Sequence, residues 1–324
     1  MKHVYVTPCL GVIVHDKMIS HINKMNVFYG GHIIFVMTHA QIELFVKIAD
    51  TGSFTKAGLE LNMTQPAVSR AISTLEAELD VTLLIRDRKN GIMLTDVGKR
   101  ILVLFRDILQ SFEKVHQEIA SEKGLEIGTI RVGAFPVASA HFLPKIIKVM
   151  AEQYPQLEFV IYEGTIDEIK EWLETRVIDV GLIIPPDDEF ETIPLFRERM
   201  YAVIRDDHPL QNRPVISVKD LSNEPLISCK SGYEPPIVDL FNRARVDLRI
   251  RFVVRNVNSA LSMVQEGLGI AVLSELSLWA LPPNVLKKEL EPEAFRDIRL
   301  AVPSLKESSN AVQTFIQTAR KLFA

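Results

Sequence analysis

Apolar residues recur at helical spacing between residues 38 and 80, in three runs that are separated by turn signals. Gly52 follows the first run as the expected left-handed stop, and Ser53 is placed to cap the second helix. The small Ala57-Gly58 pair faces inward in that second helix, where it allows another helix to approach closely. The pattern therefore predicts three short helices packed against one another.

The third helix of this group has two distinct faces. Thr64 can cap it, and its first turn tolerates Pro66 because the missing N–H falls among amides that have no helical partner. Its inward stripe recurs at helical steps and consists of Val68, Ile72, Leu75 and Leu79. The opposite face at its start carries short polar groups and a guanidinium, namely Gln65, Ser69 and Arg70. Such groups reach base edges and phosphates in a DNA major groove, so we predict a reading helix.

Two short extended segments, 81–86 and 92–95, follow around the strong hairpin signal Asn90-Gly91, which predicts a wing. Positive charges gather on this hairpin at Arg86, Arg88 and Lys89. The segment from 38 to 96 nevertheless holds 6 basic and 8 acidic residues, so its net charge is negative. Any attraction to DNA must therefore come from where the basic residues lie. The alternative is a three-helix packing module that binds no nucleic acid and carries a solvated hairpin.

A series of residues in this segment matches the sequence signature of a known family, in the same order and without insertions or deletions. The series comprises the run from Phe45 through Ala49, then Gly52-Ser53-Phe54, Ala57, Leu61, Gln65-Pro66-Ala67-Val68-Ser69, Ile72, Leu75-Glu76, Leu79, Leu83, Arg86, Leu94-Thr95 and Gly98. It is similar to the signature of LysR-type transcriptional regulators, and it departs from the usual pattern at Gly58, Asp80 and Leu84. The predicted winged helix-turn-helix would contact double-stranded promoter DNA through Ser53, Thr64, Gln65, Pro66, Ser69, Arg70, Arg86, Arg88 and Lys89.

From Asp96 to about Glu122 apolar residues recur at steps of three and four, which predicts one long amphipathic helix. The stripe consists of Val97, Ile101, Leu104, Ile108, Phe112, Val115 and Ile119. The helix would span roughly 40 Å, too long to bury this stripe on the small winged segment alone. The resemblance implies a homodimer or homotetramer that presents two heads to an interrupted palindrome. The alternative is packing against the chain's own C-terminal domain.

Extended apolar runs alternate with helical ones from residue 125 to 324, which predicts α/β lobes with mainly parallel sheets. The extended runs are 129–132, 157–162, 180–184, 200–204, 226–228, 252–254 and 270–273. Further landmarks of the same family are Leu143-Pro144, Tyr154-Pro155, Asp179-Val180-Gly181, His208-Pro209-Leu210 and Gly267-Leu268-Gly269-Ile270. They imply an effector domain similar to periplasmic binding proteins, with a small-molecule effector held between two lobes.

The predicted domains follow from these patterns: an extension at 1–36, a winged helix-turn-helix at 37–95, a linker and dimerisation helix at 96–124, and an effector-binding domain at 125–324. Within that last domain we expect lobe I to comprise 125–196 and 299–324, and lobe II to comprise 197–298. The chain would cross between the lobes near 196–199 and return near 297–302.

Residues at the ends of the predicted strands are candidates for the effector cleft. They are Phe135, Pro136, Ser139, Thr165, Ser228, Lys230, Asn256 and Asn258. Hydroxyl and amide groups beside helix N-termini receive carboxylates, and Lys230 adds a positive charge, so we favour a small anionic metabolite. Ser139 is the strongest single candidate. The alternative is that Ser and Asn here act as caps and turn residues, with Lys230 simply exposed.

Enzyme signatures are absent from the sequence. Gly267-Leu268-Gly269 lacks the third glycine of a dinucleotide fingerprint and precedes a strand, and no HExxH or GxSxG pattern occurs. A polar loop closed by Pro209 explains Asp206-Asp207-His208 better than a metal site does. We therefore expect no catalysis, cofactor or metal. The alternative function is a metabolite-binding protein or enzyme whose N-terminal module makes protein contacts only.

Composition adds limits of its own. The length of 324 residues fits about two domains, and 47% hydrophobic with 24% charged residues is typical of a folded chain. The net charge of -4 excludes a histone-like binder. Cys9 and Cys229 form no disulfide framework, and the longest apolar runs fall far short of the roughly 18 residues of a membrane span. We expect a cytoplasmic protein with no membrane partner. The family resemblance also implies contact with RNA polymerase.

Residues 1–36 show no sustained helical period, and Pro8, His15 and Asp16 interrupt the only stretch that resembles a signal peptide. The hypothesis is that translation starts near Met37. We predict that the protein made from the native locus will have the intact mass of a chain without residues 1–36. A measured mass that includes these residues would reject the hypothesis.

Overall fold

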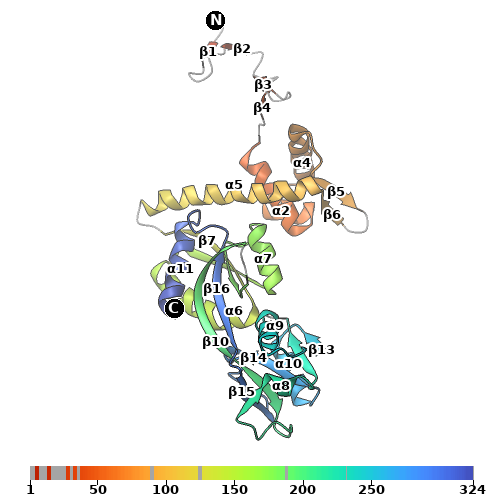
Figure 1. The fold of residues 1–324 in the computed structure, drawn as a ribbon. Helices are drawn as coiled ribbons and strands as arrows, with labels where there is room; N and C mark the ends of the chain where they lie inside the picture. The colour runs from red at the N-terminus through yellow and green to blue at the C-terminus, as the bar shows by residue number, and fades with distance from the viewer. Residues whose placement is uncertain are drawn as a thin grey trace. The chain divides into compact units, whose positions relative to one another are not determined.

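The computed structural model describes residues 4–6, 13–15, 27–29, 32–34, 37–87, 91–122, 126–186, 189–230 and 232–323. It divides into two compact units, Met1–Gln110 and Ser111–Ala324, which are described separately below (Figure 1). Within the first 36 residues, two antiparallel pairs of short strands are described. They are β1 (Val4–Val6) with β2 (Ile13–His15), and β3 (Val27–Tyr29) with β4 (His32–Ile34).

The first unit contains the predicted three helices and hairpin, which we call the head. Its elements are α2 (His39–Thr51), α3 (Phe54–Glu60), α4 (Gln65–Leu79), β5 (Leu84–Asp87) and β6 (Gly91–Leu94). Gly52 ends α2 in the left-handed region with φ of 63°, as predicted, and the Ser53 hydroxyl oxygen accepts a hydrogen bond from the Lys56 N–H. Thr64 departs from the prediction because it precedes α4 without a side-chain capping bond.

Two glycines let elements of the head approach closely. A Cβ at Gly58 would lie 2.8 Å from the Met63 carbonyl oxygen, which explains why this chain has glycine in the small pair. A Cβ at Gly98 would lie 2.2 Å from the Leu83 carbonyl oxygen. The Glu76 carboxylate completes the junction by accepting hydrogen bonds from the Leu83 and Leu84 N–H groups at 2.7 and 3.0 Å. The start of the hairpin is therefore fixed to both α4 and the following helix.

The long helix α5 spans Asp96–Ser121 (Figure 1), and its apolar side chains differ in burial. Leu102 and Phe105 lie in the core of the head, where the Phe105 ring meets Phe45 edge-on at 5.5 Å. Several residues of the predicted stripe remain exposed, at 46 to 56% of their surface: Leu104, Phe112, Val115 and Ile119. The structure thus leaves most of the C-terminal half of the stripe uncovered.

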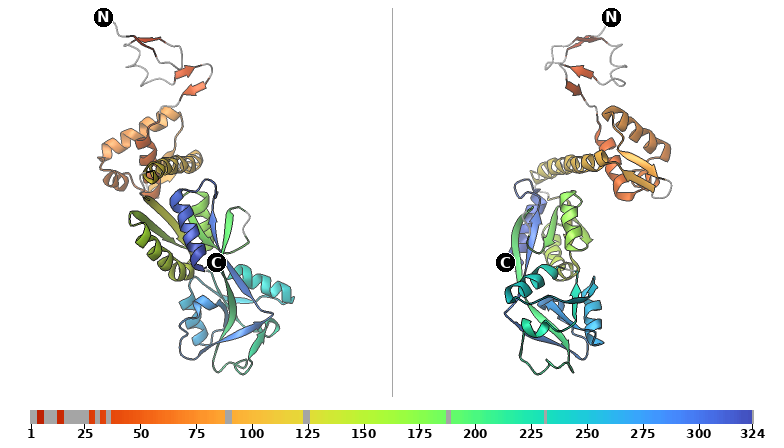
Figure 2. Two further views of the ribbon diagram at one scale, coloured as in Figure 1. Left: turned by 90° about the vertical axis from the view of Figure 1, so that its left-hand side faces the viewer. Right: turned by 45° about the vertical axis from the view of Figure 1, so that its right-hand side comes forward.

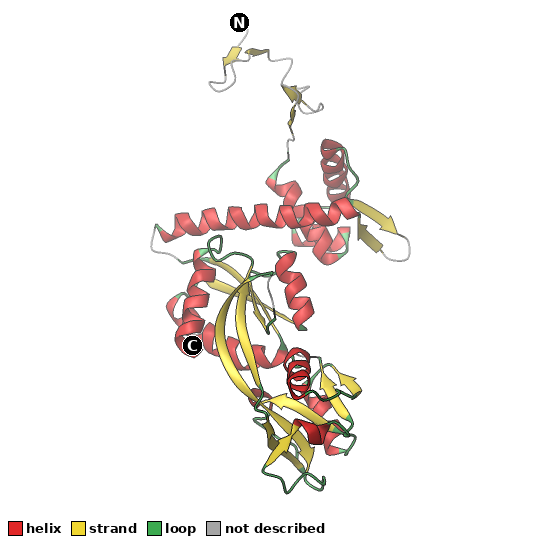
Figure 3. Ribbon diagram, in the orientation of Figure 1, coloured by secondary structure: helices red, strands yellow, loops and turns green. Residues whose placement is uncertain are grey.

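The second unit holds two lobes, and each lobe packs helices on a sheet (Figure 3). Lobe I contains β7 (Gly128–Ala134), α6 (Pro136–Gln153), β8 (Leu157–Glu163), α7 (Ile166–Glu174), β9 (Val180–Ile183) and α11 (Asn310–Phe323). Lobe II contains β11 (Val215–Ser217), α8 (Val218–Leu221), β12 (Leu226–Cys229), α9 (Glu234–Ala244), β13 (Ile250–Val254), α10 (Val257–Gln265), β14 (Ile270–Ser274), the 3-10 turn η1 (Glu275–Ser277) and β15 (Val285–Glu291).

Two long strands, β10 (Glu191–Arg205) and β16 (Phe295–Val302), connect the lobes in both views of Figure 2. Strand β10 pairs with β16 and then continues beside β14 and β15. These pairings are antiparallel, as is that of β16 with β9, whereas β7 with β8 and β12 with β13 are parallel. The expectation of mainly parallel sheets is thus wrong for the crossing strands, because a chain that leaves a lobe and returns beside itself must reverse direction.

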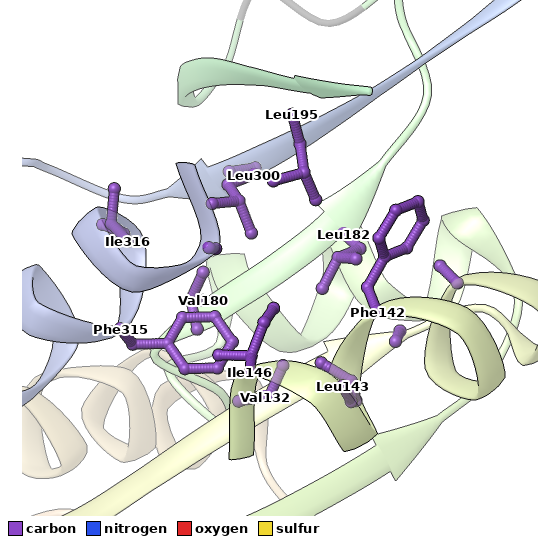
Figure 4. Close-up of a cluster of buried hydrophobic side chains, with 14 of the residues drawn as sticks. Val132, Phe142, Leu143, Ile146, Val180, Leu182, Leu195, Leu300, Phe315 and Ile316 are labelled. Atoms are coloured by element: carbon purple, nitrogen blue, oxygen red, sulfur yellow. The ribbon is translucent and has the colours of Figure 1, made fainter. Parts of the chain in front are cut away.

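The core of lobe I explains the burial of its strands (Figure 4). Val132, Val180 and Leu182 point toward side chains of α6 and α11, among which Phe142, Ile146 and Phe315 are buried. The alternating positions Gly133 and Gly181 face α7, where an added Cβ would lie 3.4 and 2.7 Å from Ile169 respectively. The Cβ at Gly133 would also lie 2.4 Å from Ile178, which precedes β9. Helices therefore cover both faces of this sheet, which leaves the strand ends as the place for a ligand.

Candidate DNA-binding face and effector cleft

The first turn of α4 presents the predicted reading face. Thr64, Gln65, Pro66 and Arg70 are exposed and Ser69 is half-buried, while Val68 between them is fully buried in the head core. Among the described residues, no side chain forms an ion pair with the Arg70 guanidinium. The Thr64 hydroxyl makes no capping bond. Buried Val68 therefore anchors a turn whose polar side chains face outward.

The remaining residues of the predicted DNA interface lie in two places. Ser53 is half-buried and is engaged as the cap of α3. The hairpin pairs β5 with β6 from Leu84 opposite Leu94 to Asp87 opposite Gly91, so it has the strand arrangement expected of a wing. Arg86 lies on β5, but its side chain is outside the described residues, as are Arg88 and Lys89. Their contacts with DNA stay predictions.

The structure separates the cleft candidates into engaged and available groups. Thr165 forms a reciprocal capping box with Glu168, and Asn256 accepts a hydrogen bond from the Ser259 N–H at 2.8 Å, so both act as helix caps. Phe135 and Ser228 are buried. The candidates that are at least partly accessible and whose side chains make no hydrogen bond to the described residues are Pro136, Ser139, Lys230 and Asn258. Of these, Pro136 and Ser139 belong to lobe I, and Lys230 and Asn258 to lobe II.

A buried polar network between the lobes was not predicted from sequence. Arg296 of β16 is fully buried, and its guanidinium donates to Glu198 of β10 at 2.8 Å and to the Ser274 hydroxyl at 2.7 Å. The guanidinium lies 5.3 Å from the Phe135 ring of lobe I and 4.2 Å from the Tyr233 ring of lobe II. Arg296 therefore contacts residues from both lobes at the strands that connect them.

A sequence signal for this network does exist. Arg296, Ile298 and Leu300 occupy alternate positions of one strand and are all buried, so the first of them is a charge on an otherwise apolar face. A charged residue at such a position needs a buried partner. Its partner Glu198 lies 98 residues away along the chain, and no local pattern identifies it.

The lobes also touch directly at Gly232, which follows β12. This glycine has φ of 79°, and an added Cβ would lie 2.2 Å from Ile184 of lobe I. Nearby, burial raises the pKa of Glu234 at the start of α9, and Asp167 of lobe I raises it further, whereas Lys230 opposes the shift. The two lobes therefore meet beside Gly232, and an acidic group of each lobe, Asp167 and Glu234, lies near this contact.

The C-terminal turns of α5 are attached to lobe I by a charged cluster. Arg131 of β7 donates two hydrogen bonds to Glu113 at 2.8 and 3.1 Å, and its backbone N–H donates to Asp179 at 2.8 Å. The bond to Glu113 raises the pKa of Arg131, while burial raises the pKa of Asp179. A Cβ at Gly128 would lie 2.3 Å from the Gln117 amide nitrogen. The end of α5 is thus held against β7 by both charge and close packing.

Comparisons with known proteins identify the class. The model of the lysR-family bacterial regulatory helix-turn-helix matches residues 39–99, and the model of the LysR substrate binding domain matches residues 123–324. The chain belongs to the LysR family of transcriptional regulators, with a helix-turn-helix and an effector-binding domain. Because this family consists of regulators, the enzyme alternative is set aside.

Individual relatives agree with this assignment. The chain is 55% identical over 289 residues to the uncharacterized HTH-type transcriptional regulator YvbU of Bacillus subtilis, covering 89% of this chain and 99% of YvbU. A full-length OxyR variant of Pseudomonas aeruginosa shares the fold with a TM-score of 0.72 at 22% identity, over 89% and 96% of the two chains. CbnR, solved with its target DNA, gives a TM-score of 0.61 at 22% identity, over 88% and 99%.

Other candidate chemistry has simple structural explanations. Asp207 forms an ion pair with Arg205, and the His208 Nε2 lies 3.4 Å from a Glu224 carboxylate oxygen. These contacts are those of a polar surface loop. Within the described residues, no group of three or more His, Cys, Asp or Glu side chains is placed to hold a metal ion. None of the described helices combines the length and apolar character that a membrane span requires.

We predict that hydrogen peroxide will leave DNA binding unchanged, although similar structures include OxyR proteins. Cys229 is 1% exposed on β12, and oxidation requires an accessible thiolate. Gel retardation with the native chain and with Cys229→Ser, each with and without peroxide, should give one common affinity. A loss of affinity on oxidation of the native chain alone would contradict this prediction.

Proposed function

We propose that this regulator binds an interrupted palindrome in promoter DNA through the exposed first turn of α4 and the β5–β6 wing. The observation that carries the proposal is the set of exposed polar residues at the start of α4, with Arg70 unpaired among the described side chains. Gln65, Ser69 and Arg70 would read base edges, with Thr64 and Pro66 beside them, while Ser53, Arg86, Arg88 and Lys89 would contact the backbone. The protein would act in the cytoplasm.

The proposed functional unit is a dimer joined along α5, in keeping with the exposed stripe at Leu104, Val115 and Ile119.

Two further surfaces, on strands β13 and β8, support assembly of such dimers into a tetramer. Strand β13, at one end of the strand order, has Ile250 and Val253 exposed in a stretch that carries Arg249, Arg251 and Arg255. Strand β8, at the other end, has Val160 and Ile161 exposed between Glu158 and Glu163. Opposite charges around apolar centres suit pairing between two copies.

The proposed effector is a small anionic metabolite held between the lobes by Ser139 and Pro136 of lobe I and by Lys230 and Asn258 of lobe II. Phe135, Thr165, Ser228 and Asn256 would shape the site from behind, since they are buried or engaged as caps. Occupancy would change the placement of the paired heads, and with it promoter bending and contact with RNA polymerase. We propose the domain division 37–95, 96–124 and 125–324, with lobes at 125–196 plus 299–324 and 197–298.

The experiment that tests this function is a footprint on the DNA upstream of the protein's own gene, with protein that starts at Met37. We expect a protected interrupted dyad that weakens steeply with added salt, because phosphate contacts release counterions. Arg70→Ala should cost about 1–3 kcal/mol of discrimination between the dyad and unrelated DNA, whereas Arg88→Ala with Lys89→Ala should weaken all DNA alike.

The matched control is Arg320→Ala, which removes an exposed guanidinium from α11 in the effector domain. It should leave the footprint unchanged. Equal behaviour of the Arg70 variant and this control would show that the reading face is placed wrongly.

A further inference from the structure

The side chain of Arg296 connects the starts of two helices that belong to different lobes. Phe135 is the N-cap residue of α6 in lobe I, and Tyr233 is the N-cap residue of α9 in lobe II. The guanidinium carbon of Arg296 lies over both rings, 5.3 Å from the centroid of Phe135 and 4.2 Å from that of Tyr233. Both distances fall within the roughly 6 Å range of cation–π attraction. One side chain on a connecting strand therefore attracts a ring of each lobe.

Hydrogen bonds hold this guanidinium in place. Glu198 lies directly opposite Arg296 in the register of β10 and β16, and its carboxylate accepts a hydrogen bond from the Arg296 Nε at 2.8 Å. The Ser274 hydroxyl of β14 accepts another at 2.7 Å and lies 3.3 Å from the Tyr233 hydroxyl oxygen. All four of these side chains are buried. Because cation–π attraction is strongest where water is excluded, the rings are held more firmly here than they would be at the surface.

Two further contacts between the lobes are apolar. Gly232 of lobe II packs against Ile184 of lobe I, and the Leu276 side chain of η1 packs against the core of lobe I. Apolar contacts have no preferred direction, so they bring the lobes together without setting the angle between them. A buried ion pair adds little net stability, since apolar residues of similar volume often replace it without loss. What the guanidinium adds is direction, because its donors and its two rings fix its orientation.

We propose that Arg296 is a positioning residue that sets the angle between the two lobes. Its guanidinium attracts the ring that begins α6 and the ring that begins α9, so it holds these two helix starts at one separation. The inference rests on the proposed effector cleft, because candidates for that cleft adjoin both starts. The Ser139 N–H donates to the Phe135 carbonyl oxygen at 2.9 Å, and Lys230 precedes Tyr233 by three residues.

The test is single-molecule energy transfer between dyes on the two lobes of the full chain. Glu152→Cys on α6 and Ser262→Cys on α10 provide exposed labelling sites, in a chain that also carries Cys9→Ser and Cys229→Ser. Exchange with excess unlabelled chain leaves one labelled copy in each assembly, so only distances within a chain are measured. With Phe135 and the arginine intact, we expect one narrow distribution of distances.

Two variants weaken the contact at different points. Phe135→Leu removes the ring of lobe I and leaves the ion pair of Arg296 with Glu198 in place. We expect the population with displaced lobes to rise by about 2- to 30-fold, the factor that corresponds to the loss of one cation–π contact. Arg296→Lys should act in the same direction, because an ammonium group keeps the charge but lacks the planar fork that is bonded and stacked at once.

The matched control is Phe315→Leu, which shortens a buried ring of α11 in the same lobe I core. It should lower the melting temperature, as Phe135→Leu does, and leave the distances unchanged. The proposal is overturned if Phe135→Leu keeps the narrow distribution, or if Phe315→Leu broadens it as much. The measurement needs neither DNA nor an effector. A broadened distribution together with a failed footprint would reject the proposed function and support the role of Arg296.

Discussion

Val115→Glu combined with Ile119→Glu is expected to separate the copies that are paired along α5 and to lower the affinity of the regulator for a palindromic site by about 100-fold or more. Both side chains are more than half exposed on α5, and carboxylates there would be desolvated in any helix pairing. Linking two heads raises affinity by about 10²–10⁴ over one head, so loss of pairing removes that factor. Light scattering with size-exclusion chromatography, and titration of labelled DNA, measure the two effects.

The control for this variant is Lys114→Glu, which adds a carboxylate to the same helix roughly 120° away from the centre of the stripe. It should keep the assembly size of the native chain and bind DNA as before. If the double variant keeps the assembly size of the native chain, the exposed stripe does not hold two copies together, and the proposed pairing along α5 is wrong.

Breaking the buried pair between Arg296 and Glu198 should have the largest effect on stability. Arg296→Met leaves the Glu198 carboxylate buried, with the Leu276 N–H as its remaining donor and no cation among the described residues, and loss of one partner of such a pair costs about 3–5 kcal/mol. For a unit of this size we expect the melting temperature of the effector domain to fall by roughly 6–20 °C. Differential scanning calorimetry of the full chain measures the change.

The companion variant removes both charges at once, as Glu198→Leu with Arg296→Met. Because no unpaired charge then remains buried, it should recover most of the lost stability. Additive losses in the double variant would show that the two residues stabilise the strands through separate contacts and not as a pair.

Local signals predicted much of the head. Gly52 and Ser53 mark the end of one helix and the start of the next because their backbone and side-chain chemistry acts within a few residues. The capping bond expected of Thr64 does not form, because a suitable residue type permits such a bond but does not require it. The exposed face at Gln65 and Arg70 followed from helical spacing alone.

Features that depend on contacts between distant parts of the chain could not be predicted from the sequence. The antiparallel course of β10 and β16 depends on where the chain returns after about 100 residues. The contact of Gly98 with the Leu83 carbonyl oxygen depends on how the long helix α5 lies against the segment before β5. Which cleft candidates serve as caps also emerged only when Thr165 and Asn256 were placed on their helices.

The path of the chain through the lobes also sets an order of folding during synthesis. Lobe II lies between the two segments that form lobe I, so β16 and α11 leave the ribosome last. Val132 must wait for its packing partner Phe315, about 180 residues later, which takes roughly 10 to 40 s at bacterial elongation rates. Through that interval the apolar face of the first strand of lobe I lacks its final cover, so the nascent chain exposes surface that a chaperone would shield from aggregation.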